Sequence, residues 1–321
     1  MPINEQIAAT IAGLGALAQC DHDISPLTTY KVGGRAAIFV RAETMQDLSL
    51  VARVVCETGV PMIPLGRGSN VLMSDHGIAG LIVQLGEVAQ QILLPRAEVS
   101  DEMHDGVAVA CSVTAGSAVA LPVLARRTAA VGIRGFEWAV GVPGSLGGAI
   151  RMNAGGHGSD ISESLVSAQV LDFRTGEIAT VLTPEFGLRF RASDIEDQQL
   201  IISGTLSLTY GSPQESLQMI DEIVRWRREN QPGGQNAGSV FVNPVPGEIT
   251  AGQLIDRCGL RGFRIGSAEV SMKHANFIQA DVGGSAQDIV TLMRHIQRVV
   301  GDTSGYELRS EIRLIGFEEE S

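Results

Sequence analysis

The feature that most constrains this chain is the glycine-rich run over residues 135–158, which holds eight glycines in 24 residues. Glycine loses more conformational freedom on folding than any other residue, so this density is costly in a packed element. It is typical of a backbone that lies close against a ligand. We interpret the run as a nucleotide-contacting loop, with a glycine-rich structural loop as the alternative. His157, in the middle of the run, is interpreted as a hydrogen-bonded or exposed loop residue rather than a base.

A second glycine turn lies upstream, where residues 64–72 read Pro-Leu-Gly-Arg-Gly-Ser-Asn-Val-Leu after a short apolar strand. Glycines let backbone N–H groups curl toward an anion, and Ser69 and Asn70 can add donors, so the turn suits a pyrophosphate. An ordinary turn is the alternative. The third glycine of the Rossmann fingerprint is missing and residues 71–73 open no obvious helix, which argues against that fold.

Composition excludes several classes of protein. The chain has 321 residues, enough for about two domains, and its 44% hydrophobic and 19% charged residues exclude a disordered chain. A net charge of −12 argues against nonspecific nucleic-acid binding, so positive charge facing an anionic substrate must be local. With no long apolar run and no basic signal region we expect a cytoplasmic protein that binds no membrane. The four cysteines are far apart, which predicts reduced thiols and no metal site.

Hydrophobic periodicity predicts an α/β unit followed by mixed α+β regions, with boundaries near residues 85 and 210. The predicted helices cover residues 4–19, 45–57, 118–130, 214–228, 251–258 and 286–300. The predicted strands cover residues 36–41, 62–65, 81–85, 107–111, 165–173, 178–182, 200–209, 277–280 and 307–315.

Three further segments carry polar side chains that could perform chemistry. Ser239 follows a glycine and is either a proton donor or a turn serine. The arginines of residues 225–228 end a predicted helix, where they complement the helix dipole or clamp a phosphate. On the predicted last strand, Glu311 and Arg313 share one face, which is either solvated or an active-site wall.

Taken together, several segments resemble the UDP-N-acetylenolpyruvoylglucosamine reductase family, flavoenzymes of bacterial cell-wall synthesis. Their order and spacing carry the signal over nearly the whole chain. The segments are residues 28–34, 66–70, 141–148, 152–155, 190–193, 237–241, 264–271 with Lys273 and His274, and 311–313.

The resemblance implies an α+β fold with an FAD-binding domain of the vanillyl-alcohol-oxidase (PCMH) type. That domain is expected in two α/β subdomains, residues 1–85 and 86–210. An α+β substrate-binding domain is expected over residues 211–305, and residues 306–321 are expected to return to the active site as a final strand and tail.

The resemblance also implies an activity: a monomeric enzyme with bound FAD uses NADPH to reduce UDP-N-acetylenolpyruvoylglucosamine to UDP-N-acetylmuramate. Arg191 would stabilise the enolate, Ser239 would protonate it, and Glu311 would orient the carboxylate or relay protons. The implied cofactor-binding residues are Gly66, Arg67, Gly68, Ser69, Asn70, Gly141, Gly144, Ser145, Gly148 and Asn153. The implied substrate-binding residues are Arg191, Arg228, Asn243 and Arg313.

Two departures from the family pattern affect these expectations. Residues 193–231 are too short to contain the substrate-covering loop of one subgroup, so the chain resembles the shorter type II form. Asn230 stands where the family often has Lys, which shifts the expected diphosphate contact to Arg225, Arg227 or Arg228.

Two alternatives stay open. One is an FAD-dependent oxidase of the same fold acting on an alcohol or sugar, with His157 or Cys111 as a covalent flavin tether. The other is a non-catalytic sugar-nucleotide-binding protein.

Overall fold

The computed structural model describes residues 1–95 and 109–317 and divides into two compact units. The first unit comprises the described parts of residues 1–18, 40–67 and 82–227, and the second those of residues 19–39, 68–81 and 228–321. The helices are α1 (Ile3–Leu14), α2 (Met45–Thr58), α3 (Leu121–Ala130), α4 (Leu146–Met152), α5 (Pro213–Asn230), α6 (Ala251–Arg257) and α7 (Ala286–Ser304). Among residues 1–95 and 109–317, no helix is both long enough and apolar enough to span a bilayer.

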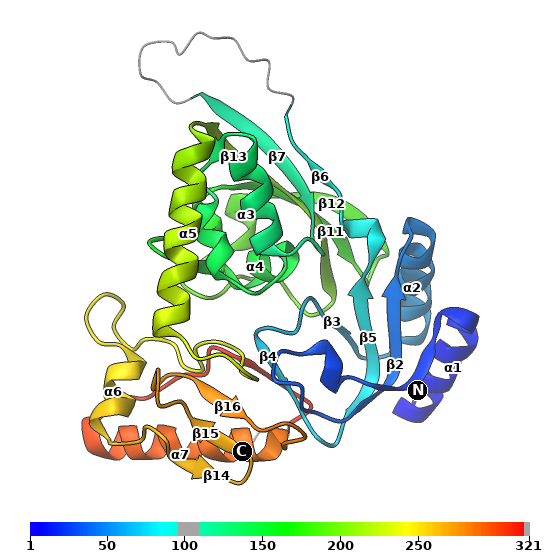
Figure 1. Cartoon of the computed structure of the whole chain (residues 1–321). Helices are drawn as coiled ribbons and strands as arrows, with labels where there is room; N and C mark the ends of the chain where they lie inside the picture. The colour runs from blue at the N-terminus through cyan, green and yellow to red at the C-terminus, as the bar shows by residue number, and fades with distance from the viewer. Residues whose placement is uncertain (96–108, 318–321) are drawn as a thin grey trace. The chain divides into compact units, whose positions relative to one another are not determined.

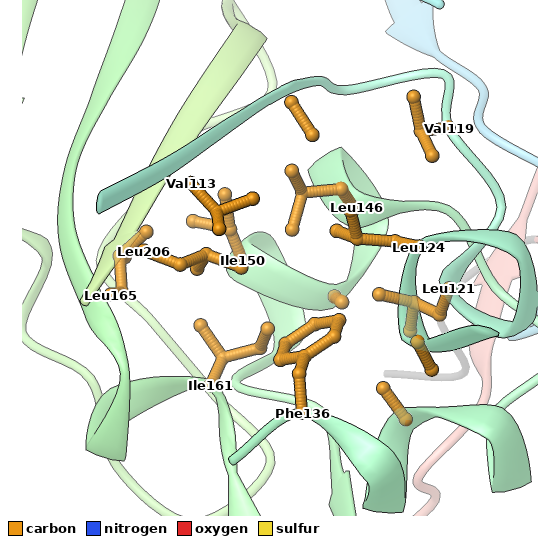
Figure 2. Packing of buried hydrophobic residues seen from close by; sticks show 14 of the residues in the cluster. Val113, Val119, Leu121, Leu124, Phe136, Leu146, Ile150, Ile161, Leu165 and Leu206 are labelled. Carbon is orange, nitrogen blue, oxygen red and sulfur yellow. The ribbon is translucent and has the colours of Figure 1, made fainter. Parts of the chain in front are cut away.

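The first unit is built on an antiparallel sheet of order β12-β11-β13-β7-β6, with β8 pairing to β13. Figure 1 shows α3, α4 and α5 over one face of this sheet. Buried side chains of these helices and of the sheet form one core, part of which Figure 2 shows around Phe136. The strands of this sheet are β6 (Ile92–Leu93), β7 (Ala110–Gly116), β8 (Ile133–Arg134), β11 (Leu165–Asp172), β12 (Glu177–Leu182) and β13 (Gln199–Tyr210). The unit also contains a separate hairpin of β9 (Gly155–Gly156) and β10 (Ser159–Asp160).

A four-stranded sheet has the order β1-β2-β5-β3, and its two central strands each contribute residues to both units. Buried residues explain why the strands form, since β2 is buried at every second position and β5 is buried over residues 80–83 and at Leu85. These strands are β1 (Gln19–Asp23), β2 (Arg35–Ala42), β3 (Met62–Pro64) and β5 (Ile78–Leu85).

The second unit packs a three-stranded antiparallel sheet, β14-β15-β16, against the amphipathic helix α7. Helix α7 begins where Ser285 and Asp75 accept its first N–H groups and ends at Gly305, which has a φ of 75°. A parallel pair joins β17 to β4, with Arg313 opposite Val71. The strands are β4 (Val71–Met73), β14 (Arg264–Ile265), β15 (Ala268–Val270), β16 (Ile278–Ala280) and β17 (Arg313–Ile315).

Most predicted elements are confirmed, and three predictions are wrong. The helix predicted over residues 4–19 ends at Leu14, because Gly15 takes a φ of 55° and the chain then enters β1. Residues 146–152 of the predicted glycine loop form α4, because its glycines admit close packing. The last strand begins only at Arg313, so Glu311 precedes it and the shared face inferred from alternation does not exist.

The strand predicted over residues 107–111 falls partly outside the described residues, since residues 107 and 108 are not described. Of the described remainder, Val109 precedes β7, and Ala110 and Cys111 are its first two residues.

Candidate active site

The first unit contains a cavity of about 180 Å³ where the two predicted glycine segments meet. Gly66 and Arg67, from the turn after β3, line it together with Ser145 and Gly148 of the second segment. The approach is close, because a Cβ on Gly66 would lie 2.8 Å from the Ser145 Oγ. Ser145 is 3% exposed, and its hydroxyl does not cap the helix α4 that follows it.

The donors around this cavity fit the diphosphate of a dinucleotide. The hydroxyls of Ser117 and Ser145 and the guanidinium of Arg67 line it, and these are the groups that bind phosphate oxygens. The first N–H groups of α4 are already used, since Leu146 N donates to the Val119 carbonyl and Gly147 N to the Ser117 carbonyl, both at 2.9 Å. Phosphate binding here would therefore depend on side chains and on the Gly66 turn rather than on the first N–H groups of α4.

Other residues of the predicted cofactor set lie elsewhere. Gly68, Ser69 and Asn70 belong to the second unit, whereas Gly141, Gly144 and Asn153 belong to the first but do not line this cavity among its described residues.

Gly68 is required by the packing of the chain itself rather than by a ligand. Its φ is 62°, and a Cβ there would lie 2.2 Å from the Leu27 carbonyl oxygen. Gly141 is likewise constrained by packing, since a Cβ would lie 3.1 Å from the His157 ring.

Asn153 supports the segment that carries Arg191. It is buried at the end of α4 in a left-handed conformation, with φ 39°. Its side-chain N–H groups donate to Asp160 and to the Arg189 carbonyl, both at 3.2 Å, and its Oδ1 accepts from Ser162 N at 3.0 Å. Both the N–H groups and the oxygen of the Asn153 side chain are therefore used in hydrogen bonds within the protein.

Arg191 is half-buried and also takes a left-handed φ, 56°. Its Nη2 donates to the Gly155 carbonyl at 2.7 Å, and its guanidinium carbon lies 5.0 Å from the centre of the Phe190 ring. Left-handed conformations are unfavourable for residues with a Cβ and cluster at functional sites. The geometry therefore fixes one arginine in a defined orientation.

His157 packs edge-on against Trp226, with ring centres 5.1 Å apart. Burial, and then the charge of Arg227, lower the pKa of His157 below its usual value, and burial raises the pKa of the Cys111 thiol. Neither side chain is among the described residues that line the glycine-rich cavity. No observation here therefore supports a covalent flavin tether at these positions.

Of the three candidate diphosphate arginines, Arg227 is half-buried and the other two are exposed.

In the second unit, main-chain hydrogen bonds join the segments that carry Ser239 and Glu311. Glu311 N donates to the Val240 carbonyl at 2.8 Å, one residue beyond Ser239. Asn70 then joins the same assembly, because its Nδ2 donates to the Glu311 carbonyl and its own carbonyl accepts from Arg313 N, both at 3.0 Å. Residues far apart in the sequence are thus brought together in one unit.

Ser239 lines a second cavity, of about 310 Å³, within this unit. Asn243, Arg261, Lys273 and His274 line it as well. Ser239 is half-buried, and its hydroxyl has no hydrogen bond within the described residues. The Asn243 Oδ1 accepts from Ala251 N at 3.1 Å, which ties it to the start of α6.

The surroundings of His274 in this cavity favour its neutral form. Its Nδ1 accepts from Asn276 N at 3.3 Å, and burial together with the charge of Arg261 lowers its pKa. The part of the chain that the structure describes has no cluster of three His, Cys, Asp or Glu side chains placed to hold a metal.

The sequence interpretation missed Ser117 as a lining residue of the first cavity and His274 and Asn276 as lining residues of the second. Ser117 follows Gly116 in a short loop, a weak signal for a phosphate contact. His274 lies in a segment already noted for the family resemblance, but no spacing pattern connects it to Ser239.

Comparisons with known proteins first define the class. Residues 36–182 match the family described as FAD binding domain, and most of the residues that line the first unit's cavity fall within this range. Residues 230–315 match the family described as UDP-N-acetylenolpyruvoylglucosamine reductase, C-terminal domain. The predicted α+β fold class is thereby confirmed.

Similar chains identify the family. The curated UDP-N-acetylenolpyruvoylglucosamine reductase of Gloeobacter violaceus is 40% identical over 90% of this chain and 93% of its own length. That of Anoxybacillus flavithermus is 36% identical over 90% of this chain and 91% of its own. The crystal structure of the enzyme from Thermus caldophilus matches with a TM-score of 0.76 and 29% identity, over 93% of this chain and 99% of that one. The chain belongs to the UDP-N-acetylenolpyruvoylglucosamine reductase family.

Proposed function

We propose that this protein uses NADPH and bound FAD to reduce UDP-N-acetylenolpyruvoylglucosamine to UDP-N-acetylmuramate in peptidoglycan precursor synthesis. The observation that carries the proposal is the main-chain connection in the second unit between the segments of Ser239 and Glu311. A cytoplasmic location and a monomeric state stay predictions from the sequence.

Gly66, Arg67, Ser117, Ser145 and Gly148 would hold the FAD diphosphate, because they supply donors and open backbone at one cavity. When bound, FAD supplies a hydride to the enolpyruvyl double bond of the substrate. The remaining tasks belong to the protein: orienting the substrate, stabilising negative charge, and donating a proton.

Arg191 is proposed to stabilise the negative charge that develops on the enolpyruvyl carboxylate. A guanidinium presents a planar pair of donors that matches a carboxylate, and it stays charged at all relevant pH values. The Gly155 carbonyl and the Phe190 ring hold this group in one orientation, which supports a role that depends on direction.

Ser239 is proposed to donate the proton to the enolate carbon. A hydroxyl is a sufficient acid here because a carbanion is a strong base, and Ser239 has no hydrogen bond within the described residues that would compete. Glu311 is proposed to orient the substrate carboxylate or relay protons, with Arg313 orienting Glu311. Asn70 supports both through their main chain.

Substrate binding is assigned to Arg191, Arg228, Asn243 and Arg313. The Asn230 side chain carries no positive charge, so Arg227 is a further candidate for binding the diphosphate. Burial lowers the pKa of Arg227, but its guanidinium stays charged at neutral pH. Because the chain carries a net charge of −12, these local cations would decide whether an anionic sugar nucleotide binds.

The test follows flavin absorbance in stopped flow, with NADPH reducing the enzyme and the enolpyruvyl substrate reoxidising it. Ser239→Ala should leave FAD affinity and reduction by NADPH unchanged and slow reoxidation by roughly 10²- to 10⁴-fold, the usual contribution of a general acid. Ser239→Cys should recover part of the loss, since a thiol is a proton donor of similar size.

Two outcomes would contradict the proposal in different ways. Equal slowing of both phases by Ser239→Ala would make the serine structural and leave Glu311 as the next proton donor. A wild-type protein that is reduced by a sugar or alcohol, and not reoxidised by the enolpyruvyl substrate, would be an oxidase.

A further inference from the structure

Asn276 is a buried polar residue, 4% exposed, that hydrogen-bonds to the segment of Ser239. Its Oδ1 accepts from Phe241 N at 3.0 Å, and its Nδ2 donates to the Phe241 carbonyl at 2.8 Å. Its own carbonyl accepts from Val240 N at 2.8 Å. One asparagine therefore binds three of the four main-chain polar groups of the two residues after Ser239.

These hydrogen bonds fix the direction in which the Ser239 side chain projects from the main chain. The Val240 N–H belongs to the peptide group that follows Ser239, so holding it restricts rotation about the serine's ψ. On the other side of Val240, the carbonyl accepts from Glu311 N. The peptide groups on both sides of Val240 are therefore held, the first by Asn276 and the second by Asn276 and Glu311 together.

Asn276 also sets the ring of His274. The hydrogen bond from Asn276 N to the His274 Nδ1 leaves the proton of the neutral ring on Nε2. His274 and Ser239 line the same cavity, so Asn276 orients one of its polar side chains through its main-chain N–H and holds the main chain next to the other.

We propose that Asn276 is a positioning residue for proton transfer: it holds the Ser239 segment so that the hydroxyl meets the substrate from one direction. The inference rests on the proposed function of Ser239. Asparagine suits the task because only a side-chain amide of this length offers both a donor and an acceptor to the main chain of one residue. Asn276 touches neither substrate nor cofactor in this role, and it acts through Ser239.

The sharpest variant is Asn276→Asp, which keeps the shape and the acceptor for Phe241 N. At high pH its carboxylate faces the Phe241 carbonyl with no proton to donate, and at low pH the protonated group restores the donor. Burial should raise the pKa of this carboxyl, although Arg261 and Lys273 in the same cavity oppose that effect. His274 titrates nearby in the wild type too, so rates are compared as the ratio of variant to wild type at each pH.

We expect the reoxidation phase of Asn276→Asp to be slowed at least about tenfold at pH 8 and to recover toward the wild-type rate near pH 5.5. Reduction by NADPH and FAD affinity should stay unchanged. In hydrogen exchange the Phe241 and Val240 amides should lose protection at pH 8 and regain it at the lower pH.

The control for general loss of stability is Val300→Ala, which removes buried methyl groups from α7 in the same core. It should lower the urea midpoint without a phase-selective or pH-dependent effect on the rates. If Asn276→Asp behaves like this control, or slows both phases equally at every pH, the positioning role is wrong. If the wild type itself shows no reoxidation by the enolpyruvyl substrate, the proposed function fails instead.

Discussion

Replacing Gly148 by alanine is expected to stabilise the FAD-free protein and to weaken FAD binding. Gly148 lies inside α4, where alanine is favoured over glycine by up to about 1 kcal/mol. The space for a Cβ is open: apart from its own helix and chain neighbours, the nearest heavy atom is the Ser145 Oγ at 3.7 Å. The substitution therefore adds no clash within the protein.

The added methyl group would instead occupy the cavity. Gly148 and Ser145 both line this space of about 180 Å³, which we assign to the FAD diphosphate. A diphosphate that approaches the backbone at Gly148 would have to move away, and we expect a loss of at least about tenfold in FAD affinity, equivalent to about 1.4 kcal/mol. The two effects have opposite signs, which a general folding defect cannot produce.

The assay combines urea unfolding of FAD-free protein with a fluorescence titration of FAD. The matched control is Gly301→Ala on α7, where no heavy atom lies within 4 Å of a Cβ and no cavity residue is affected. It should show a similar gain in stability and unchanged FAD affinity. If Gly148→Ala binds FAD with wild-type affinity, the diphosphate does not lie beside Gly148.

Substitutions at three further positions test other parts of the structure. Gly68→Ala places a Cβ 2.2 Å from the Leu27 carbonyl at a φ of 62°, so urea unfolding of FAD-free protein should show a loss on the order of 3 kcal/mol; wild-type stability would contradict the packing explanation. Arg191→Lys keeps the charge and loses the planar fork, so steady-state kcat/KM should fall at least about tenfold, and wild-type kcat/KM in Arg191→Ala would remove the residue from the mechanism. Asp288 accepts from Ser267 N and Oγ, which lowers its pKa, so its contribution is present above its ordinary value of 3.8 and lost as pH falls through the folded pKa. Asp288→Asn should therefore destabilise the protein by about 1 kcal/mol at pH 7 and by progressively less as the pH falls below 3.8, and a constant difference across this range would exclude the charge as the cause.

The long helices and strands could be predicted from the sequence because each buries one face, and this face sets the spacing of the hydrophobic residues. Helix α7 shows this best, since its buried residues recur with helical spacing and Ser285 marks its beginning. The segment before β17 failed because its apolar alternation resembles a strand, yet residues 307–312 find only one bridge, between Ser310 and Phe241. A segment forms a strand only if another strand lies beside it to accept and donate main-chain hydrogen bonds. The local sequence pattern holds no information about that neighbour.

Glycine-rich segments were the strongest signal and also the most ambiguous. Residues of both segments were expected to bind one cofactor, and Gly66 and Gly148 do line one cavity. The sequence could not separate glycines that open a cavity from those that admit another part of the chain, such as Gly68 and Gly141. Both types relieve a steric conflict, and only the identity of the neighbouring atom distinguishes them.

The positions of Ser239 and Glu311, the reactive residues we propose in the second unit, depend on main-chain hydrogen bonds and on two asparagines rather than on their own side chains. Val240 is held on one side by Asn276 and on the other by Glu311 N, and Glu311 is held in turn by Asn70. Each bond uses a backbone group that a substitution of Ser239 leaves in place. Removing the serine hydroxyl should therefore change the chemistry without moving the segment, whereas changing Asn276 should move the segment without changing the chemistry. The two kinds of variant would separate reactivity from geometry in the proposed active site.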